Sequence, residues 1–243
     1  MRIPRFYEDQ PLQAGTEIEL SDAVVQHVSR ALRMQSGDLL TLFNGDGCEY
    51  RARLSRVEKR NAYAHIEEQV TRSSESPLRV SIGQTLSRGE RMDYAVQKST
   101  EMGVAAITPL FSERCEVKLP KERQPKRVSH WQQIAISACE QSGRQIPPLI
   151  HTPETLETWL QAQDAELKLV LHHHSEQPLA QMDAPTSVAL LIGPEGGLSE
   201  AEVELAISHG FRPLTLGPRV MRTETAPVAA LSILNYLWGD LGG

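Results

Sequence analysis

Hydrophobic positions divide the chain into two regions of different periodicity. In the first 72 residues, short apolar stretches at 18–20, 39–43, 50–54 and 63–66 alternate with polar turn sequences. One of these turns, Asn44-Gly45-Asp46-Gly47, contains the Asn-Gly and Asp-Gly pairs typical of hairpins. A single helix is predicted over 22–33. The pattern predicts a small β-rich unit.

After a polar stretch at 71–77, which has linker composition and contains Pro77, the periodicity changes. Apolar segments now alternate with amphipathic ones, which predicts a parallel sheet covered by helices on both faces. The predicted strands are 78–85, 105–110, 149–152, 167–171, 187–192 and 212–216. The predicted helices are 92–102, 127–139, 154–161, 199–209 and 226–238. We therefore expect an α/β fold with a domain of residues 1–72 and a second of residues 73–243.

Composition excludes several classes of protein. Hydrophobic residues make up 40% of the chain and charged residues 23%, as in ordinary globular proteins. No apolar run approaches the roughly 20 residues of a membrane span, and the N-terminus lacks the apolar core of a signal peptide. Cys48, Cys115 and Cys139 show no C-x-x-C spacing, so neither a zinc site nor a disulfide framework is indicated. We expect a cytoplasmic protein without a membrane segment.

The net charge of −6 argues against nucleic acid as a partner, but the distribution of charge does not. Residues 79–127 carry 10 basic and 6 acidic side chains. A polyanion needs a local basic surface rather than a basic average. The alternative interpretation of these side chains is a solvated charged face.

The first pattern with chemical meaning follows the all-apolar strand at 187–192. Gly193-Pro194-Glu195-Gly196-Gly197 allows a sharp turn and a close approach of backbone to a ligand. Ser199 and Glu202 form a capping box, so a helix begins there. Strand, glycine loop and helix together predict a ligand site at the carboxyl edge of the sheet. The spacing is neither G-x-G-x-x-G nor a phosphate loop with lysine, and a tight turn without a ligand is the alternative.

A second polar loop follows the predicted strand at 212–216. Gly217, Arg222, Thr223, Glu224 and Thr225 gather polar groups at the same edge of the sheet. Thr223 or Thr225 is expected to cap the last helix, whose first turn accepts a proline at 227. An ion pair of Arg222 with Glu224 or Glu195 is the purely structural alternative.

Together these residues resemble the SPOUT methyltransferases, and within them the small-subunit ribosomal RNA methyltransferase E family, which acts on uridine N3. The resemblance covers the whole chain. It is carried by Gly193-Pro194-Glu195-Gly196-Gly197, Leu216-Gly217, Val220-Met221-Arg222, Glu224-Thr225-Ala226, Arg2-Ile3-Pro4-Arg5, His27, Arg30, Leu32-Arg33-Met34, Gln97-Lys98, Thr100-Glu101-Met102-Gly103 and Glu140-Gln141-Ser142-Gly143-Arg144. Met221 and Met102 stand where leucine is expected, a substitution that conserves volume.

The resemblance implies an N-terminal PUA-like β-barrel that binds RNA and a SPOUT domain with a deep trefoil knot. It implies S-adenosylmethionine as the methyl donor, no metal, a homodimer, and a uridine of small-subunit ribosomal RNA in the assembled subunit as the target. The last helix, with Val228, Leu231, Leu234 and Leu237 near helical spacing, is a candidate for the dimer interface or simply packs on its own sheet.

The resemblance also implies which residues hold the cofactor, in three loops. They are Leu171, His172, Ile192, Gly193, Pro194, Glu195, Gly196, Gly197, Leu214, Leu216, Gly217, Val220, Met221, Arg222, Thr223 and Thr225. The three adjacent histidines His172, His173 and His174 do not predict a metal site, because successive side chains at a strand end point in opposite directions.

Methyl transfer to a uracil nitrogen requires the loss of the N3 proton, whose pKa lies well above neutral. Either a base takes that proton or nearby cations stabilise the uracil anion. The planar guanidinium of Arg222 or Arg144 suits the second role. Glu140 is expected to orient an arginine or to accept the proton, and Glu195 is the other candidate carboxylate.

Six basic side chains are candidates for contacts with RNA phosphates, and the alternative for each is a solvated surface charge. They are Arg2, Arg5, Arg30, Arg33, Lys98 and Arg114. Three alternatives to the N3-uridine enzyme are kept. They are a SPOUT enzyme acting on another RNA or on ribose 2′-hydroxyls, a non-catalytic ribosome-assembly factor, and a nucleotide-binding enzyme of another kind.

Overall fold

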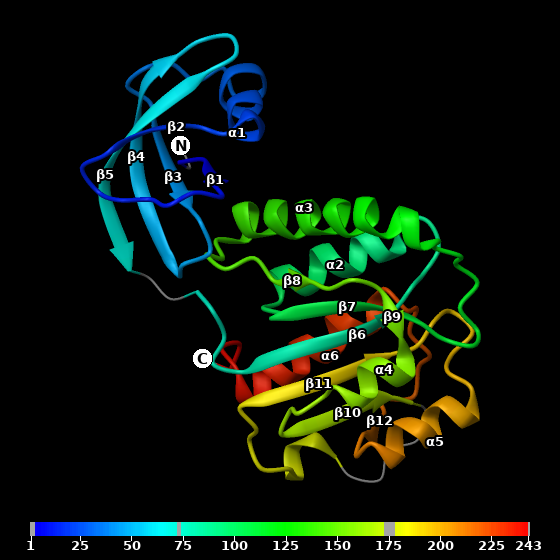
Figure 1. The fold of residues 1–243 in the computed structure, drawn as a ribbon. Helices are drawn as coiled ribbons and strands as arrows, with labels where there is room; N and C mark the ends of the chain where they lie inside the picture. The colour runs from blue at the N-terminus through cyan, green and yellow to red at the C-terminus, as the bar shows by residue number, and fades with distance from the viewer. Residues whose placement is uncertain (1–2, 72–73, 173–177, 243) are drawn as a thin grey trace. The chain divides into compact units, whose positions relative to one another are not determined.

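The computed structural model describes residues 3–71, 74–172 and 178–242, and the chain forms two compact units (Figure 1). The first unit comprises the chain up to Glu75 together with Cys139–Pro147. The second comprises Ser76–Ala138 and Pro148–Gly243. Residues 139–147 therefore group with the N-terminal segment. A single domain boundary between residues 72 and 73 does not predict this grouping.

The first unit contains a five-stranded sheet in the order β1-β3-β4-β5-β2. Its strands are β1 (Arg5–Tyr7), β2 (Glu17–Glu19), β3 (Leu39–Phe43), β4 (Cys48–Val57) and β5 (Ala62–Thr71). β1 runs parallel to β3, and the other pairs are antiparallel. The predicted helix is shorter and less regular than expected. It consists of α1 (Asp22–Gln26) followed by the π-helical turn η1 (His27–Ala31).

The alternating pattern of β4 explains how this sheet buries one face. Tyr50, Ala52 and Leu54 are buried in the core of the first unit, whereas the side chains between them are exposed. The turn from β3 to β4 has Gly45 and Gly47 at φ of 90° and 85°, conformations that favour glycine. The hairpin predicted from this turn sequence is thus confirmed.

The second unit contains a parallel sheet in the order β12-β10-β11-β6-β7-β8, with the short β9 paired to β7. Its strands are β6 (Arg79–Thr85), β7 (Ala106–Phe111), β8 (Leu149–Ile150), β9 (Glu154–Thr155), β10 (Leu167–Leu171), β11 (Ser187–Ile192) and β12 (Arg212–Leu214). The predicted α/β class with a parallel sheet is confirmed. The helix expected over 154–161 begins later, because Glu154 and Thr155 pair with β7 instead.

Helices cover both faces of this sheet (Figure 1). They are α2 (Arg91–Glu101), α3 (Gln124–Ser142), α4 (Leu156–Gln161), α5 (Glu200–Ser208) and α6 (Thr225–Trp238), with 3₁₀ turns η2 (Lys121–Arg123) and η3 (Leu179–Gln181). Trp131 of α3 and Leu231 of α6 pack in one core cluster with Leu190 of β11. Trp159 of α4 packs in another with Leu191, which points to the opposite face of β11. This two-sided burial is why the strand is apolar from Val188 to Ile192.

Because the strands of the second sheet are parallel, their carboxyl ends lie at one edge, and the segments that follow β6, β10, β11 and β12 meet there. No helix among the described residues is long and apolar enough to cross a membrane.

Candidate functional site

The loops after β10 and β12 are joined at this edge of the sheet. The backbone amide of His172 donates to the Leu214 carbonyl at 2.9 Å. The Thr215 hydroxyl donates in return to the His172 carbonyl at 3.0 Å. These bonds extend the pairing of β10 with β12 by one residue beyond Leu171 and Leu214. His173 and His174 lie outside the described residues.

The glycine loop after β11 forms a tight turn that leads into α5. The Gly197 amide donates to the Pro194 carbonyl at 2.9 Å, and Gly197 has a φ of 70°. The predicted capping box is confirmed, since the side chains and amides of Ser199 and Glu202 bond reciprocally. A Cβ on Gly193 would lie 3.0 Å from Leu198 Cγ and 3.1 Å from the Leu198 nitrogen, so the loop is packed against itself.

Thr223 connects the glycine loop to two other segments. Its buried hydroxyl donates to the Gly193 carbonyl at 2.8 Å and accepts from Gln84 Nε2 at 3.0 Å. The expectation that Thr223 or Thr225 caps the last helix is wrong. The N-cap of α6 is Glu224, which makes no side-chain capping bond, and the Thr223 hydroxyl is occupied by the loop instead.

A further segment, between β6 and α2, completes this edge and was missed by the sequence analysis. Glu195 of the glycine loop accepts from Arg91 Nη1 at 2.7 Å and from the Arg88 amide at 3.2 Å. Burial of Glu195 opposes ionisation, but hydrogen bonds from its own amide, from Arg91 and from Arg88 outweigh it and lower the pKa of Glu195. Arg91 Nε also lies 3.9 Å from Glu224 Oε1. Arg222, the partner considered from sequence, lies 4.0 Å from Glu224, with its side chain 78% exposed.

A cavity of about 690 Å³ opens beside this network. Its walls come from the β6–α2 segment, the first turn of α2, the segment after β7, the glycine loop and the start of α6. The lining residues are Arg88, Gly89, Glu90, Arg91, Tyr94, Glu116, Glu195, Glu224 and Thr225. Arg88 pairs with Glu116 at 2.8 Å, and Arg91 with Glu195. A volume between about 300 and 1,000 Å³ is typical of sites for small molecules.

Buried polar atoms without a hydrogen-bond partner gather in the same part of the described structure. They include Gln84 Oε1, Thr85 Oγ1, Ser87 Oγ and Glu224 Oε2. Leaving such an atom unsatisfied costs about 1–3 kcal/mol, so a cluster of them requires an explanation. The polar groups of a bound ligand would supply one.

The segment after β7 supports the glycine loop from outside. Arg114 Nη1 donates to the carbonyls of Gly196 and Leu198 at 3.2 and 3.4 Å. The Glu113 amide donates to Glu202 Oε1 at 2.7 Å. Arg114 was predicted to contact RNA, which stays a prediction; in this structure its guanidinium holds the loop.

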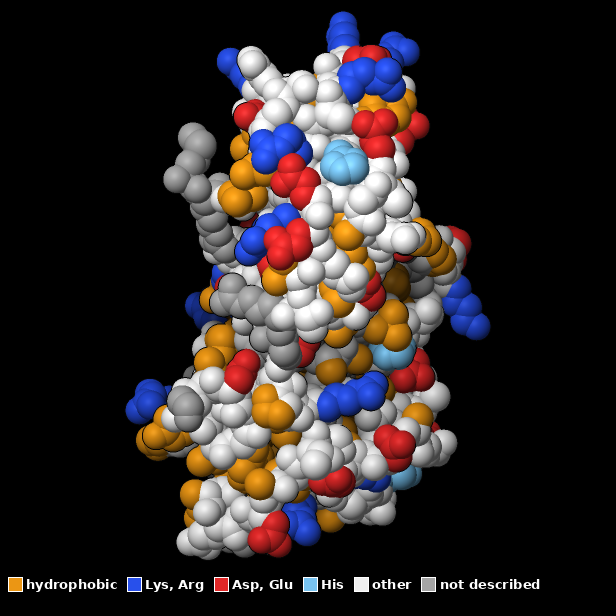
Figure 2. Space-filling view, turned by 90° about the vertical axis from the view of Figure 1, so that its left-hand side faces the viewer, with side chains coloured by type: hydrophobic (Ala, Val, Ile, Leu, Met, Phe, Trp, Pro, Cys, Tyr) orange, Lys and Arg blue, Asp and Glu red, His pale blue; other side chains and the backbone are white. Residues whose placement is uncertain are grey.

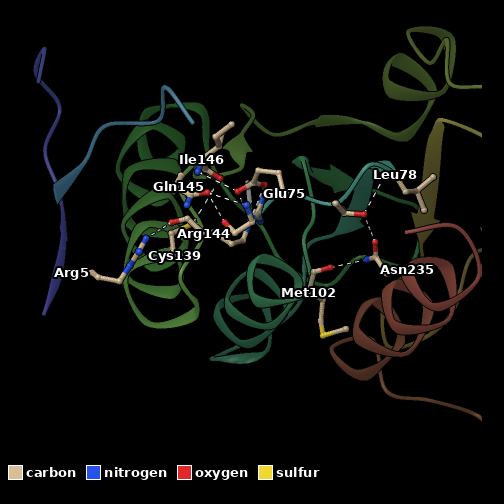
Figure 3. A network of polar contacts seen from close by, with 11 residues as sticks. Arg5, Glu75, Leu78, Met102, Cys139, Arg144, Gln145, Ile146 and Asn235 are labelled. Atoms are coloured by element: carbon tan, nitrogen blue, oxygen red, sulfur yellow. Dashed lines mark hydrogen bonds and ion pairs between the residues drawn. The ribbon is translucent and has the colours of Figure 1, made fainter. Parts of the chain in front are cut away.

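Glu140 and Arg144, the other predicted catalytic residues, lie in the first unit, whereas Arg222 lies in the second. Arg144 is 5% exposed and forms an ion pair with Glu75 (Figure 3). Its carbonyl accepts from Arg5 Nη2 at 3.0 Å. Glu140 accepts from the Tyr7 amide at 3.1 Å. Burial raises the pKa of Glu140 above its ordinary value, although that hydrogen bond and nearby His27 and Arg5 act against it.

The remaining predicted RNA contacts differ in how available they are. Arg30 and Arg33 are exposed, and Arg33 adopts a φ of 52°. Arg5 pairs with Glu49, and Lys98 lies 2.7 Å from Glu101 Oε1. Arg2 lies outside the described residues. On the face drawn in Figure 2, Lys and Arg side chains are interspersed with Asp and Glu side chains. No group of three or more His, Cys, Asp or Glu side chains arranged to hold a metal ion occurs within the described parts of the chain.

Comparison with known proteins gives consistent matches along the whole chain. Residues 74–235 match the model of an RNA methyltransferase domain, and residues 20–67 match that of an RNA methyltransferase PUA domain. Ribosomal RNA small subunit methyltransferase E of Buchnera aphidicola is 37% identical over 99% of this chain and 98% of its own length. The enzyme of the same name from Bacillus subtilis is 31% identical over 93% of each chain.

Two solved structures are similar in fold as well as in sequence. A Legionella pneumophila protein in complex with its cofactor S-adenosylmethionine superposes with a TM-score of 0.96 at 45% identity, over 99% of this chain and 100% of the other. Ribosomal RNA small subunit methyltransferase E of Neisseria gonorrhoeae, bound to S-adenosylmethionine, gives a TM-score of 0.93 at 41% identity, over 98% and 99% of the two chains.

Proposed function

Because this chain belongs to the ribosomal RNA small subunit methyltransferase E family of RNA methyltransferases, we propose that it methylates N3 of one uridine in small-subunit ribosomal RNA. In coarser terms, it is an S-adenosylmethionine-dependent ribosomal RNA methyltransferase with a PUA-like N-terminal domain and a SPOUT-type α/β domain. The observation that supports the finer proposal is the convergence of the segments after β6, β11 and β12 at the cavity, with the loop after β10 bonded to the end of β12.

The residues at this edge fit S-adenosylmethionine. Its ammonium, carboxylate and ribose hydroxyls can donate to or accept from buried atoms that lack partners, such as Gln84 Oε1 and Thr85 Oγ1. Gly197 and Gly217 have φ of 70° and 80° with no neighbouring atom where a Cβ would lie, so ligand atoms could come close to their backbone. When bound, this cofactor supplies an electrophilic methyl group.

We propose that the three loops predicted from sequence hold the cofactor. The residues are Leu171, His172, Ile192, Gly193, Pro194, Glu195, Gly196, Gly197, Leu214, Leu216, Gly217, Val220, Met221, Arg222, Thr223 and Thr225. The bonds from His172 to Leu214 and from Thr223 to Gly193 support this proposal, because they join all three loops. Val220, also in this set, is 98% exposed.

Among the predicted catalytic residues, the geometry favours Arg222 as the cation that stabilises the uracil anion. Its side chain is exposed beside the cavity wall formed by Glu224, so its guanidinium can reach a carbonyl oxygen of the base. Arg144, whose side chain is 6% exposed, would first have to leave its ion pair with Glu75. For Arg144 and Glu140 we propose instead that they hold residues 139–147 to the N-terminal unit.

For the rest of the assembly we propose what the family resemblance implies. The N-terminal residues 1–72 bind RNA through Arg30 and Arg33, the chain works as a cytoplasmic homodimer, the α/β domain of residues 73–243 is knotted, and the substrate is the assembled small subunit. The exposure of Arg30 and Arg33 supports their role.

The test is methyl transfer from labelled S-adenosylmethionine to small ribosomal subunits, and separately to naked small-subunit RNA, from cells lacking the corresponding methylation. Nuclease digestion and mass spectrometry then identify the product. Label in 3-methyluridine at one site is the expected result, with subunits the better substrate. Label in a ribose 2′-O-methyl nucleoside or in another RNA would redirect the assignment, and no transfer to either substrate would contradict it.

A further inference from the structure

The cavity has a wall that none of the three predicted cofactor loops supplies. Arg88, Gly89, Glu90, Arg91 and Tyr94 belong to the β6–α2 segment and to the first turn of α2. The cavity therefore extends from two of the cofactor loops, which supply Glu195 and Thr225, to a wall outside them. A methyltransferase needs such a second space, because the methyl acceptor must lie next to the donor.

The charges around the cavity favour a neutral ring over a phosphate. Its lining includes the carboxylates of Glu90, Glu116, Glu195 and Glu224, whereas each of its two arginines is already paired. The four carboxylates outnumber the two arginines, and the net negative charge of the lining repels a phosphate. A neutral base is not repelled, and its N–H donors can bond to the carboxylate oxygens of the lining.

Tyr94 provides an aromatic face for such a ring. It is 47% exposed, and it lines the cavity from the first turn of α2, where its backbone amide bonds to the Glu90 carbonyl. Bases turned out of an RNA helix are commonly held by stacking on aromatic side chains. Methylation of a base nitrogen requires that nitrogen to be freed from pairing.

Arg91 lies near the carboxylates of Glu195 and Glu224, and these two carboxylates differ in their hydrogen bonds. Glu195 is occupied by Arg91 and by the Arg88 amide. Glu224 has both nearby guanidiniums on Oε1, with Arg91 at 3.9 Å and Arg222 at 4.0 Å. Its Oε2 has no partner, even though Glu224 is the N-cap of α6 and could have capped it. Glu224 therefore contributes a carboxylate to the cavity wall, and the Oε2 of this carboxylate is buried and has no partner.

We propose that the cavity receives the target uridine, with its base against Tyr94 and its N3–H donated to the carboxylate of Glu224, which takes the proton. This inference rests on the proposed function. The N3–H bond breaks, the proton passes to the Glu224 carboxylate, and the bonding electron pair stays on N3, which is then the nucleophile. Glu195 has a different role, since it positions Arg91 and fastens the glycine loop.

The experiment compares Glu224→Gln with wild type on two versions of the same RNA substrate, one containing uridine and one 5-fluorouridine. Fluorine makes the N3–H more acidic, so the reaction depends less on a protein base. We expect Glu224→Gln to lower kcat about 100-fold or more on the uridine RNA. On the fluorinated RNA the ratio of wild type to variant should shrink at least about tenfold, while the Kd for S-adenosylmethionine stays within about threefold of wild type. Glu204→Gln, which removes an exposed carboxylate from α5, is the matched control.

A defect of equal size on both RNAs would mean a structural role and would overturn the proposal, as would turnover of Glu224→Gln within about threefold of wild type. If Glu224→Gln does not fold, Tyr94→Ala and Tyr94→Phe decide. Loss of the ring should raise KM for RNA about tenfold, whereas phenylalanine should keep it near wild type; an unchanged KM for Tyr94→Ala contradicts the site. Absence of 3-methyluridine with wild-type protein would instead refute the proposed function.

Discussion

At the scale of single residues, the polar side chains of the site divide into those that fasten loops and those that have a buried oxygen without a partner. Thr223 and Glu195 belong to the first group, because each bonds to a segment more than a hundred residues away in the sequence or to a neighbouring loop. Glu224 and Ser87 belong to the second, since each has a buried oxygen without a partner. Residues that fasten loops should control the affinity for the cofactor, and Glu224 should control the chemistry.

Thr223→Val tests the first group, because it keeps the side-chain shape and removes the hydroxyl. The Gly193 carbonyl and the Gln84 amide then lose a buried partner, which costs about 1–3 kcal/mol of stability. We expect a lower melting temperature and a Kd for S-adenosylmethionine raised about tenfold, measured by calorimetry. Thr223→Ser, which keeps the hydroxyl, should lie much closer to wild type; equal losses in both variants would exclude the hydrogen bonds as the cause.

Glu140 predicts a pH dependence of stability. Burial raises its pKa above the ordinary value of 4.5, so the folded unit binds this proton more tightly than the unfolded chain does. The stability that Glu140 contributes is therefore present below about pH 4.5 and is lost as pH rises through the raised pKa. Glu140→Gln keeps an acceptor for the Tyr7 amide but has no charge. Its stability relative to wild type should increase from about pH 4 to about pH 7 in urea unfolding. A difference that stays constant over this range would contradict the assignment.

At the scale of elements, the last turn of α6 is held by a buried side chain rather than by a regular cap. Asn235, 1% exposed, accepts from the Ser76 hydroxyl at 2.7 Å and donates to the Met102 carbonyl at 2.9 Å (Figure 3). It thus joins the end of α6 to the end of α2 and to the start of the second unit. A Cβ on Gly239 would lie 2.2 Å from Asn235 Oδ1, so a larger residue there would displace this link.

Asn235→Ala should therefore destabilise the second unit. It leaves the Met102 carbonyl and the Ser76 hydroxyl without this partner, at a cost of about 1–3 kcal/mol, plus the cavity left by the amide. The measurement is the urea midpoint at constant m-value. Asp240→Ala, an exposed residue of the same region, should stay within about 0.5 kcal/mol of wild type, and a comparable loss for both variants would refute the specific role of Asn235.

At the scale of the whole molecule, binding of the cofactor should stabilise the folded chain. A ligand at about 100 times its Kd adds about 2.7 kcal/mol to the stability of the state that binds it. We expect S-adenosylmethionine to raise the melting temperature, and ATP and NAD to leave it unchanged, because no phosphate-binding lysine accompanies the glycine loop. Stabilisation by ATP alone would contradict the cofactor assignment.

The proposed homodimer has its own test at this scale. Ile233 and Tyr236 of α6 are 39% and 66% exposed, and covering them in a dimer would remove apolar surface from water. Light scattering at micromolar concentration should give the mass of a dimer, and Ile233→Glu with Tyr236→Glu should lower it to that of a monomer. Ile207→Glu on α5, at 47% exposure in the wild type, is the control and should leave the mass unchanged.

The sequence alone determined features that depend on local patterns. The all-apolar run of β11 indicates a strand buried on both faces, and Asn44-Gly45-Asp46-Gly47 predicts a hairpin. The Ser199–Glu202 capping box lies within one helical turn, so its geometry follows from spacing alone. Each of these features needs only neighbours in the chain, whose distances the backbone fixes.

Only the tertiary structure decided which distant groups meet. Residues 139–147 join the N-terminal unit through Arg144 and Glu75. The N-cap of α6 is a glutamate with one buried, unpaired oxygen rather than a capping threonine. Arg91 reaches Glu195 although 104 positions separate them. The physical reason is that strand order and helix packing bring such groups together. A pattern along the chain does not specify the partner of a side chain when that partner belongs to a different element.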